Sequence, residues 1–311
     1  MRAAADLLRV SAASIEFQNP VLLAAGTAAY GRELEGVMNL DALGGIVTKA
    51  VSPEPRKGAP SPRVAEFDGG MINAVGLANP GLDVVRRDDL PWLEKNLRGP
   101  RVIVNVVGNV LEDFAAVVEG LTTISRVDAF ELNVSCPNTK AGGMEFGADR
   151  DTLAALIQRA RSTTSKPLFV KLSPTLPSIA DTARAAVDAG ADGLTLVNTI
   201  PGLVIDVEKR RPSLGFGTGG VSGPGLLPVG VLAVWKVSRA VDVPVIGVGG
   251  VSKGTDAIQY LMAGAKLVAV GTAALRDPRA PDRVLAGMRS WCEKHNVSDV
   301  SEIVGSLEWQ S

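Results

Sequence analysis

Short apolar segments recur along the chain, and most of them are separated by enough residues to form a helix. Eight segments rich in Val, Ile and Leu lie at 21–25, 45–48, 102–106, 129–134, 168–172, 193–197, 244–248 and 267–270. They lack strict alternation of apolar and polar residues, which is typical of strands buried on both faces of a parallel sheet. Amphipathic helical patterns lie between several of them, at 150–162, 179–189, 229–240 and 255–263. The sequence therefore predicts an α/β protein built from repeated strand–helix units.

Eight such units fit a closed (β/α)8 TIM barrel. An open, doubly wound sheet is the alternative, but that fold is expected to carry a G-x-G-x-x-G motif after its first strand, and none follows residues 21–25. No change of composition marks a linker, so we expect a single barrel domain over residues 1–311. The segment 52–89, which contains Pro, Gly and Asn, is predicted to be an insertion at the carboxyl-terminal mouth of the barrel, where loops often carry function.

The composition excludes several classes of protein. Hydrophobic residues make up 46% of the 311 residues and charged residues 21%, which is enough for a large core and excludes intrinsic disorder. A net charge of -1 provides no general attraction for nucleic acid or for an acidic membrane. Two cysteines and one histidine cannot build a four-cysteine cluster or a histidine-rich site, so no metal site is expected.

The amino-terminal residues do not resemble a secretory signal, because Asp6 and Arg9 interrupt the apolar stretch that a signal requires. The longest uncharged segment, 212–235, holds seven glycines and three prolines, which a membrane-spanning helix would not. We therefore expect a cytoplasmic protein with no membrane partner and no nucleic-acid partner.

Polar side chains stand where the predicted strands end, which in a parallel barrel is the location of the active site. Lys49 and Lys171 each close an apolar segment, so we expect buried stems and ammonium groups that face the mouth and stabilise an anion. Extension of either side chain to solvent is the alternative. Side-chain amides that donate and accept hydrogen bonds would suit a planar ligand with alternating N–H and C=O groups, although turns and caps also use asparagine. They belong to Asn73, Asn79, Asn133, Asn138 and Asn198.

Glycines follow the last two predicted strands. Gly249 and Gly250 end one strand, and Gly271 and Thr272 end the next, each before a helix. Backbone N–H groups at such a position attract a phosphate, so a phosphate-bearing cofactor is predicted, with tight turns as the alternative.

Cys136 lies in the motif NVSCPN at 133–138, just beyond the fourth strand and before a glycine-rich segment, 142–147, that could form a lid. The single histidine, His295, lies in a polar carboxyl-terminal segment and is expected at the surface. A thiol is therefore a candidate for proton transfer, with a buried structural cysteine as the alternative. Cys292, far from any strand end, is expected to be inert.

Several motifs together resemble class 1 dihydroorotate dehydrogenases, the flavoprotein enzymes of pyrimidine synthesis. They are TKA at 48–50, NAVGLANPG at 73–81, NVSCPN at 133–138, VKLSP at 170–174, VNT at 197–199, SGP at 222–224, GVGG at 247–250 and GT at 271–272. The similarity runs in order from about residue 10 to beyond residue 271, and segments 53–56, 62–66 and 70–77 are most similar to class 1B, the catalytic subunits of NAD-linked enzymes.

The resemblance implies FMN bound across the barrel mouth. The phosphate would contact Gly223, Gly249, Gly250, Gly271 and Thr272, and the ring and ribityl chain would contact Ala25, Lys49, Ala50, Asn105, Asn133, Lys171 and Val197. Ala25 stands where many relatives have serine, so the expected contact there is through the backbone.

The resemblance also implies the substrate and the chemistry. Dihydroorotate would be held by Lys49, Asn73, Ala74, Val75, Gly76, Leu77, Asn133, Asn198 and Thr199. Oxidation to orotate removes a proton from C5 and a hydride from C6, so Cys136 is expected to be the base and FMN the hydride acceptor. Lys171 is the second expected catalytic residue, placed to stabilise negative charge on the reduced flavin.

Class 1B relatives suggest the partners. A second subunit carrying FAD and a [2Fe-2S] cluster would pass electrons to NAD⁺, because this chain lacks the four cysteines that such a cluster usually needs. A homodimeric core is also expected. The alternatives are a fumarate-linked class 1A enzyme, a dihydropyrimidine dehydrogenase-like enzyme, a tRNA dihydrouridine synthase and a noncatalytic phosphate-binding barrel.

Overall fold

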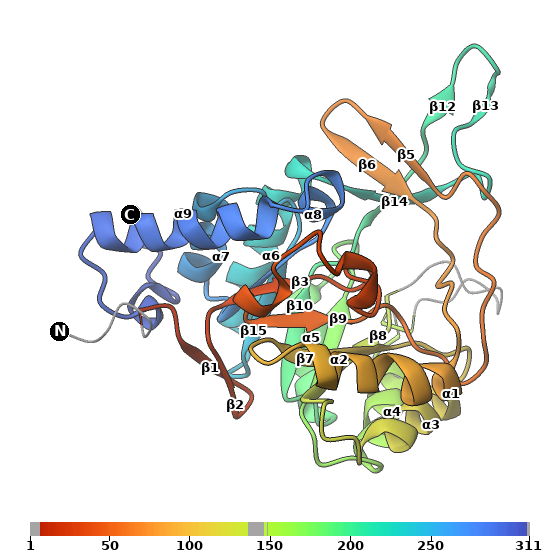
Figure 1. Cartoon of the computed structure of the whole chain (residues 1–311), viewed down its shortest axis with the longest axis horizontal. Coiled ribbons are helices and arrows are strands. Elements are labelled where there is room, and N and C mark those ends of the chain that lie inside the picture. Colours follow the sequence, from red (N-terminus) through yellow and green to blue (C-terminus); the bar gives the residue numbers. More distant parts are fainter. Residues whose placement is uncertain (1–6, 136–145, 148, 310–311) are drawn as a thin grey trace.

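The predicted strands form a closed barrel. The computed structural model describes residues 7–135, 146–147 and 149–309. Within them, parallel strands hydrogen bond in a ring in the order β10-β15-β16-β3-β4-β7-β8-β9 (Figure 1). Their bounds are β3 (Val21–Leu23), β4 (Gly45–Val47), β7 (Arg101–Val106), β8 (Ala129–Asn133), β9 (Leu168–Leu172), β10 (Gly193–Leu196), β15 (Val245–Val248) and β16 (Leu267–Val270). The prediction of a (β/α)8 barrel is confirmed.

Helices cover the outside of this barrel. They are α1 (Leu82–Val84), α2 (Leu90–Asn96), α3 (Leu111–Leu121), α4 (Arg150–Arg161), α5 (Ile179–Asp188), α6 (Leu227–Ser238), α7 (Gly254–Ala263), α8 (Thr272–Arg276) and α9 (Ala280–Lys294). Short 3-10 turns lie at Arg32–Leu34, Leu40–Ala42, Pro224–Leu226 and Val300–Ile303, and a π-helical turn at Val85–Asp89 joins α1 to α2. The helical patterns predicted from the sequence correspond to α4, α5, α6 and α7.

Helix α4 shows how local sequence produces these elements. Its N-cap residue, Asp149, accepts a hydrogen bond from the backbone N–H of Thr152 at 2.8 Å, which satisfies a donor that the first turn leaves free. Its buried residues recur every three or four positions, at Leu153, Leu156, Ile157 and Ala160. Burying each large aliphatic side chain against the barrel contributes about 1.5–3 kcal/mol, so this stripe fixes the face that packs inward.

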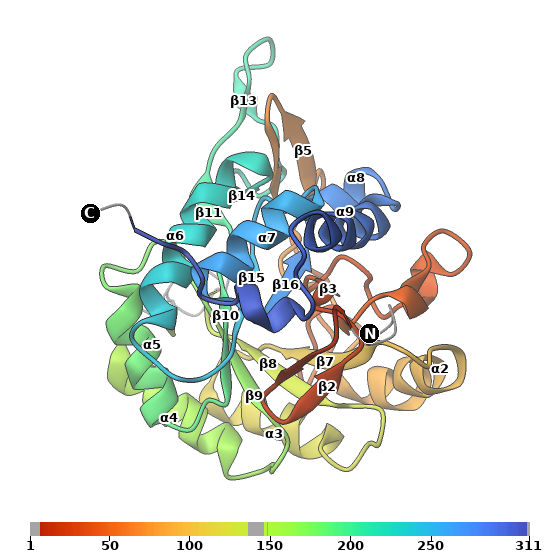
Figure 2. The same cartoon turned by 90° about the vertical axis from the view of Figure 1, so that its left-hand side faces the viewer.

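An antiparallel hairpin lies at the amino-terminal end of the barrel. Strands β1 (Val10–Ala12) and β2 (Ile15–Phe17) each show the buried–exposed–buried alternation of a sheet with one face covered. Figure 2 shows this hairpin in front of the barrel strands. This hairpin was not predicted from the sequence pattern.

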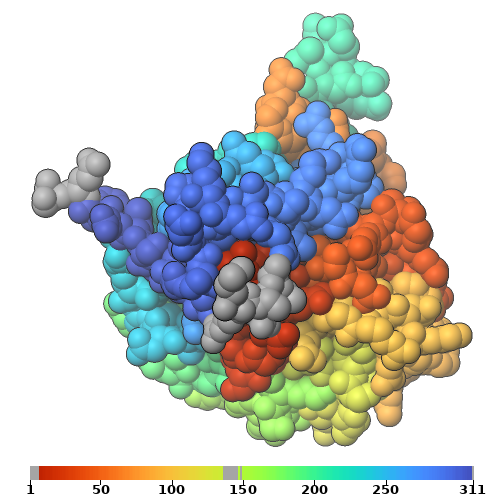
Figure 3. Space-filling view, turned by 60° about the vertical axis from the view of Figure 1, so that its left-hand side comes forward, coloured from red at the N-terminus to blue at the C-terminus, as the bar shows by residue number. Residues whose placement is uncertain are grey.

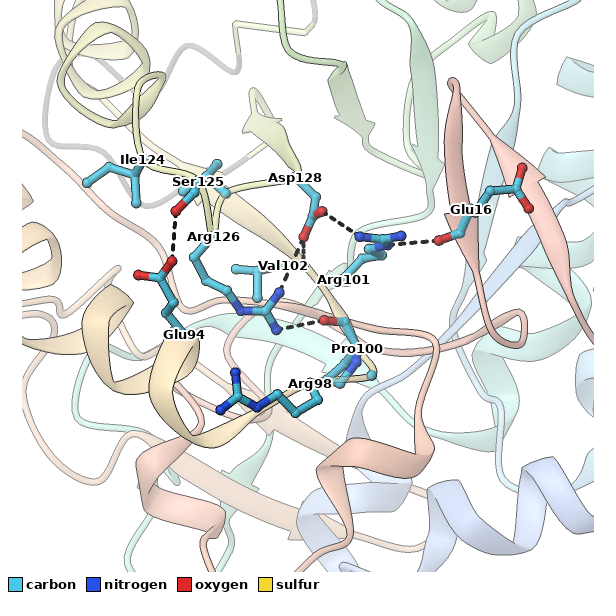
Figure 4. Close-up of polar contacts among 12 residues, drawn as sticks. Glu16, Glu94, Arg98, Pro100, Arg101, Val102, Ile124, Ser125, Arg126 and Asp128 are labelled. Carbon is cyan, nitrogen blue, oxygen red and sulfur yellow. Dashed lines mark hydrogen bonds and ion pairs between the residues drawn. The ribbon is translucent and has the colours of Figure 1, made fainter.

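A polar network joins the hairpin to the starts of the barrel strands (Figure 4). Asp128, directly before β8, accepts from Arg101 Nη1 at 3.3 Å, and Arg101 Nε donates to the Glu16 carbonyl at 2.8 Å. The Arg126 side chain, 11% exposed, lies 3.6 Å from Asp128 and donates to the Pro100 carbonyl at 2.7 Å. Burial lowers the pKa of Arg126, and Asp128 opposes that shift. Because this network lies at the end opposite the mouth, we assign it a structural role.

A second sheet stands beside the barrel, with strand order β11-β14-β6-β5. Its hairpin, β5 (Val64–Phe67) and β6 (Gly70–Asn73), comes from the predicted insertion, whereas β11 (Ile200–Gly202) and β14 (Gly219–Ser222) come from the loop after β10. Between them, β12 (Ile205–Asp206) and β13 (Arg211–Pro212) form a hairpin that projects from the molecule (Figure 3). The prediction of an insertion was therefore incomplete, since half of this sheet comes from a second loop.

Helices α7 and α9 approach each other through two glycines. A Cβ on Gly254 would collide with the backbone of Gly287, whereas a Cβ on Gly287 would lie 3.1 Å from the backbone of Gly254. No side-chain rotation relieves either contact, because the neighbouring atoms are backbone.

We expect Gly254→Ala to lower the free energy of unfolding by about 1–3 kcal/mol, since the helices must move apart. Gly287→Ala is the matched control: its contact is milder, and replacing a glycine inside a helix by alanine returns up to about 1 kcal/mol. Thermal unfolding followed by circular dichroism should rank Gly254→Ala below Gly287→Ala. The opposite ranking would contradict this packing.

Candidate functional site

The residues predicted at the strand ends gather at the carboxyl-terminal mouth, because all eight barrel strands run parallel. Asn105, Asn133 and Lys171 lie within strands β7, β8 and β9. The others follow the remaining strands: Ala25 after β3, Lys49 and Ala50 after β4, Val197 after β10, Gly249 and Gly250 after β15, and Gly271 and Thr272 after β16. Every strand of the barrel therefore contributes to one site.

A buried polar cluster lies inside the barrel. Asn105 Nδ2 donates to Glu131 Oε1 at 2.7 Å, and Thr195 Oγ1 donates to Glu131 Oε2 at 2.7 Å. Asn105 and Glu131 are 1% exposed and Thr195 is 2% exposed. The cluster connects strands β7, β8 and β10. Asn105 is one of the predicted site residues, whereas Glu131 and Thr195 lie in segments that the sequence predicts to be apolar strands.

Lys171 and Asn133 are neighbours in the register of β8 and β9. Lys171 is buried, with 7% of its surface exposed, as the sequence predicted for a lysine at the end of an apolar strand. Asn133 Oδ1 is buried and accepts no hydrogen bond within the described part of the chain. An acceptor left without a partner costs free energy, so this oxygen is suited to receive a ligand donor.

The loop after β4 is fixed by the loop after β3. The Lys49 backbone N–H donates to the Ala29 carbonyl at 2.7 Å, and Tyr30 Oη donates to the Ala50 carbonyl at 2.9 Å. Burial, with smaller contributions from Asp89 and Glu33, raises the pKa of Tyr30 far above its ordinary value, so the hydroxyl stays a neutral donor. Lys49 itself is half-buried.

The second sheet brings Asn73 and Thr199 together. Asn73 lies opposite Gly220 in the register of β6 and β14, and its Nδ2 donates to the Gly220 carbonyl at 3.3 Å. A Cβ on Gly220 would collide with the Thr199 side chain, so this glycine lets Thr199 lie against β14. The predicted substrate segments 73–77 and 198–199 are therefore adjacent.

Residues after Asn73 form a tight turn. Ala74 is buried and donates its N–H to the Arg63 carbonyl at 2.8 Å, while Val75, Gly76 and Leu77 are half-buried. Asn79 departs from the expectation of a ligand-binding amide, because its Oδ1 accepts from Ser52 and Gly81 and its Nδ2 donates to Ser52 Oγ and Leu77. Its role is to hold this turn.

Asn198 ties the end of β10 to the segment after β8. Its Nδ2 donates to Ser135 Oγ at 2.7 Å and to the Ser135 carbonyl at 3.4 Å, and its Oδ1 accepts from the Thr199 N–H at 2.9 Å. Both ends of this amide are engaged in the structure. The predicted base, Cys136, follows Ser135 directly but lies outside the described residues, as does Asn138.

A glycine-lined rim completes the site on the side of β15 and β16. Thr272 Oγ1 donates to Ser222 Oγ at 2.8 Å, which joins the residue before Gly223 to the start of α8. Gly249 and Gly250 have φ values of 126° and 72°, which favour glycine, and a Cβ on Gly250 would collide with the first residue of α6. Tyr260 Oη supports this turn by donating to the Gly249 carbonyl at 2.8 Å. Glycine at position 250 is therefore needed for the turn to pack against α6, as the tight-turn alternative expects.

Sequence reasoning missed four residues that hold neighbouring side chains and loops of this site in place: Glu131, Thr195, Ser135 and Tyr30. A usable signal existed only for Glu131, whose charge interrupts an otherwise apolar strand. The prediction that His295 lies at the surface is confirmed, and Cys292, which is predicted to be inert, is fully buried.

None of the helices in the described residues combines the length and the apolar character that a membrane span requires. The described residues also contain no group of three or more His, Cys, Asp or Glu side chains suited to holding a metal ion.

Known proteins similar to this chain agree in name. The family model for dihydroorotate dehydrogenase matches residues 7–291. The chain is 45% identical over 300 residues to the catalytic subunit of dihydroorotate dehydrogenase B (NAD(+)) from Geotalea uraniireducens (strain Rf4), covering 96% of this chain and 98% of that protein. It is 45% identical over 301 residues to the protein of the same name from Geobacter sulfurreducens, covering 97% and 98%.

A solved structure supports the same relationship. The crystal structure of DHODH from Eimeria tenella in complex with ferulenol matches with a TM-score of 0.81 and 27% identity, covering 96% of this chain and 88% of that one. The chain therefore belongs to the dihydroorotate dehydrogenase family, and its resemblance to the class 1B catalytic subunits is confirmed.

Proposed function

We propose that this chain is the catalytic subunit of an NAD⁺-linked dihydroorotate dehydrogenase, which oxidises (S)-dihydroorotate to orotate in de novo pyrimidine (UMP) biosynthesis. The observation that carries the proposal is the 45% identity, over 96% of the chain, to a relative with that name. The mouth supplies what the reaction needs: two lysines, several amides and a glycine-lined rim, all within one barrel domain.

Membership of the family implies a flavin cofactor, and we propose FMN. The described residues fit this group, because Asn133 Oδ1 is a buried acceptor with no partner among them and the buried Lys171 is its neighbour in the register of β8 and β9. Gly223, Gly249, Gly250, Gly271 and Thr272 would hold the phosphate, and Ala25, Lys49, Ala50, Asn105, Asn133, Lys171 and Val197 the ring and ribityl chain. When bound, FMN supplies the acceptor for the C6 hydride.

Lys49 would bind the substrate carboxylate, because it follows β4 at the mouth and Ala29 fixes its backbone there. Asn73 through Leu77 and Thr199 would surround the substrate ring, which is supported by the adjacency of Asn73 and Thr199 across Gly220. Asn133 and Asn198 would add amide contacts, and Asn198 would have to exchange a bond to Ser135 or Thr199 to do so.

Cys136 would remove the C5 proton. The support is its position directly after Ser135, whose side chain is held by Asn198 at the mouth. A thiol is the base that this chain offers there, since His295 lies beyond the end of α9 and is exposed.

The relatives' name supports a proposal for the physiological acceptor and for a partner subunit. A protein named a catalytic subunit has a partner subunit, and we propose that this partner carries FAD and a [2Fe-2S] cluster, because the two cysteines of this chain cannot ligate such a cluster. We further propose a homodimeric core and a cytoplasmic location. A fumarate-linked reaction is the competing outcome of the test below.

Anaerobic mixing of the FMN-loaded protein with dihydroorotate should bleach the flavin absorbance. Dihydrouracil, the corresponding reduced pyrimidine without the carboxylate that Lys49 would bind, should leave the absorbance unchanged and serves as the control. Turnover with NAD⁺ should require the partner subunit, and fumarate should not support it. Bleaching by dihydrouracil alone, or turnover with fumarate alone, would contradict the proposal.

Cys136→Ala should slow flavin reduction by at least about a hundredfold while FMN stays bound, because general-base catalysis is typically worth about 10²–10⁴-fold. The active form is the thiolate, and an ordinary thiol has a pKa of about 8.5, so the wild-type rate should rise with pH through the mildly alkaline range. Stopped-flow absorbance measures both effects. Near wild-type reduction in Cys136→Ala would exclude this base.

Lys171→Ala should lower the affinity for FMN or its reduction potential, because a buried cation no longer stabilises negative charge on the ring. Lys166→Ala is the matched control, since Lys166 lies at the opposite end of β9, where its Nζ donates to the Ile124 and Val127 carbonyls. Redox titration of the bound flavin measures the potential. An unchanged potential and affinity in Lys171→Ala would contradict this role.

A further inference from the structure

Glu131 is a buried carboxylate that the mechanism above does not use. It lies in β8, where its neighbours Phe130 and Leu132 are fully buried, and only 1% of its own surface is exposed. It precedes Asn133 by two positions, so both side chains face the same side of the strand, with Glu131 one layer further from the mouth.

The carboxylate contacts neighbours on two other strands. Oε1 accepts from Asn105 Nδ2 on β7, and Oε2 accepts from Thr195 Oγ1 on β10, each at 2.7 Å. Burying a carboxylate costs several kcal/mol, and hydrogen bonds to neutral donors offset that cost only in part. An aliphatic residue at this core position would stabilise the fold more than a carboxylate, so stability alone does not account for Glu131.

The contact with Asn105 determines which end of that amide is available. A carboxylate only accepts hydrogen bonds, so the NH₂ end of Asn105 must face Glu131 and the carbonyl end must face away. The backbone of Asn105 is fixed as well, since its N–H donates to Thr48 Oγ1 at 3.2 Å and its residue pairs with Glu131 in the register of β7 and β8. Asn105 is therefore held as a hydrogen-bond acceptor.

We propose that Glu131 is a positioning residue of the cofactor site. It acts through Asn105, whose orientation it fixes so that the Oδ1 atom is presented to an N–H group of the bound flavin. This inference rests on the proposed function, because it requires FMN to bind at the mouth.

The test compares two substitutions of Glu131 by titrating FMN into apo-protein and following the quenching of flavin fluorescence. Glu131→Gln keeps the length and an acceptor oxygen for Asn105 but removes the charge, whereas Glu131→Asp keeps the charge on a side chain that is one methylene shorter. If Glu131 acts by positioning, Glu131→Gln should bind FMN with an affinity within about threefold of wild type. Glu131→Asp should bind FMN about tenfold more weakly, which is the effect of one lost buried hydrogen bond. The reverse order would overturn the proposal in favour of a direct effect of charge.

A double-variant cycle tests the route through Asn105. Asn105→Ala should weaken FMN binding, and adding Glu131→Asp to it should change the affinity by no more than about twofold, since the group that Glu131 positions is already gone. Full additivity would overturn the proposal. Thr195→Val is the matched control, because it removes the other partner of Glu131 and leaves Asn105 in place, so its FMN affinity should stay within about threefold of wild type.

Thermal unfolding of each apo-protein separates a folding defect from a binding defect. If Glu131→Asp does not fold, the visible absorbance spectrum of bound FMN provides the test. The spectrum of Glu131→Gln should match that of wild type, and the spectrum of Asn105→Ala should be shifted. A Glu131→Gln spectrum that matches the Asn105→Ala spectrum would overturn the proposal. Wild-type apo-protein that binds no FMN would contradict the proposed function itself. Normal binding to wild type and to Glu131→Asp would contradict this inference alone.

Discussion

Hydrogen bonding of eight short parallel strands into a closed ring is the constraint from which the site follows. Parallel strands have all their carboxyl ends at one end of the barrel, so residues from Ala25 to Thr272 meet there although most of the chain separates them. The amino-terminal end is covered by the β1–β2 hairpin and by the network around Asp128. The structural network and the candidate site thus lie at opposite ends of the same strands.

The interior of the barrel is more polar than its sequence pattern indicates. Lys171, Asn105 and Glu131 are all nearly inaccessible to solvent, and each carries a polar group that the core must satisfy. Two donors satisfy Glu131, whereas Asn133 Oδ1 has no partner within the described residues. The difference suggests a division of roles, in which deeper residues orient the side chains nearer the mouth and those side chains contact the ligand.

The barrel and four of its helices could be predicted from the sequence, because buried parallel strands and amphipathic helices leave local patterns that need no knowledge of distant residues. The second sheet could not, since β11 and β14 are short and contain glycine, and β14 pairs with β6 from far along the chain. The same limit applies to the asparagines. Asn79 and Asn133 look alike in sequence. Only their contacts in the folded chain show that Asn79 holds a turn, whereas Asn133 Oδ1 has no partner among the described residues. Resemblance to a family supplied the role of Cys136, which lies outside the described residues.

The proposed reaction requires a thiol and a flavin on opposite faces of one substrate ring. A crystal structure of the protein with FMN and orotate tests this most directly. We expect the Cys136 sulfur to lie within contact distance of C5 of orotate, on the face away from the flavin ring, with Lys171 beside the ring. A sulfur on the same face as the flavin, or FMN bound away from the mouth, would contradict the account.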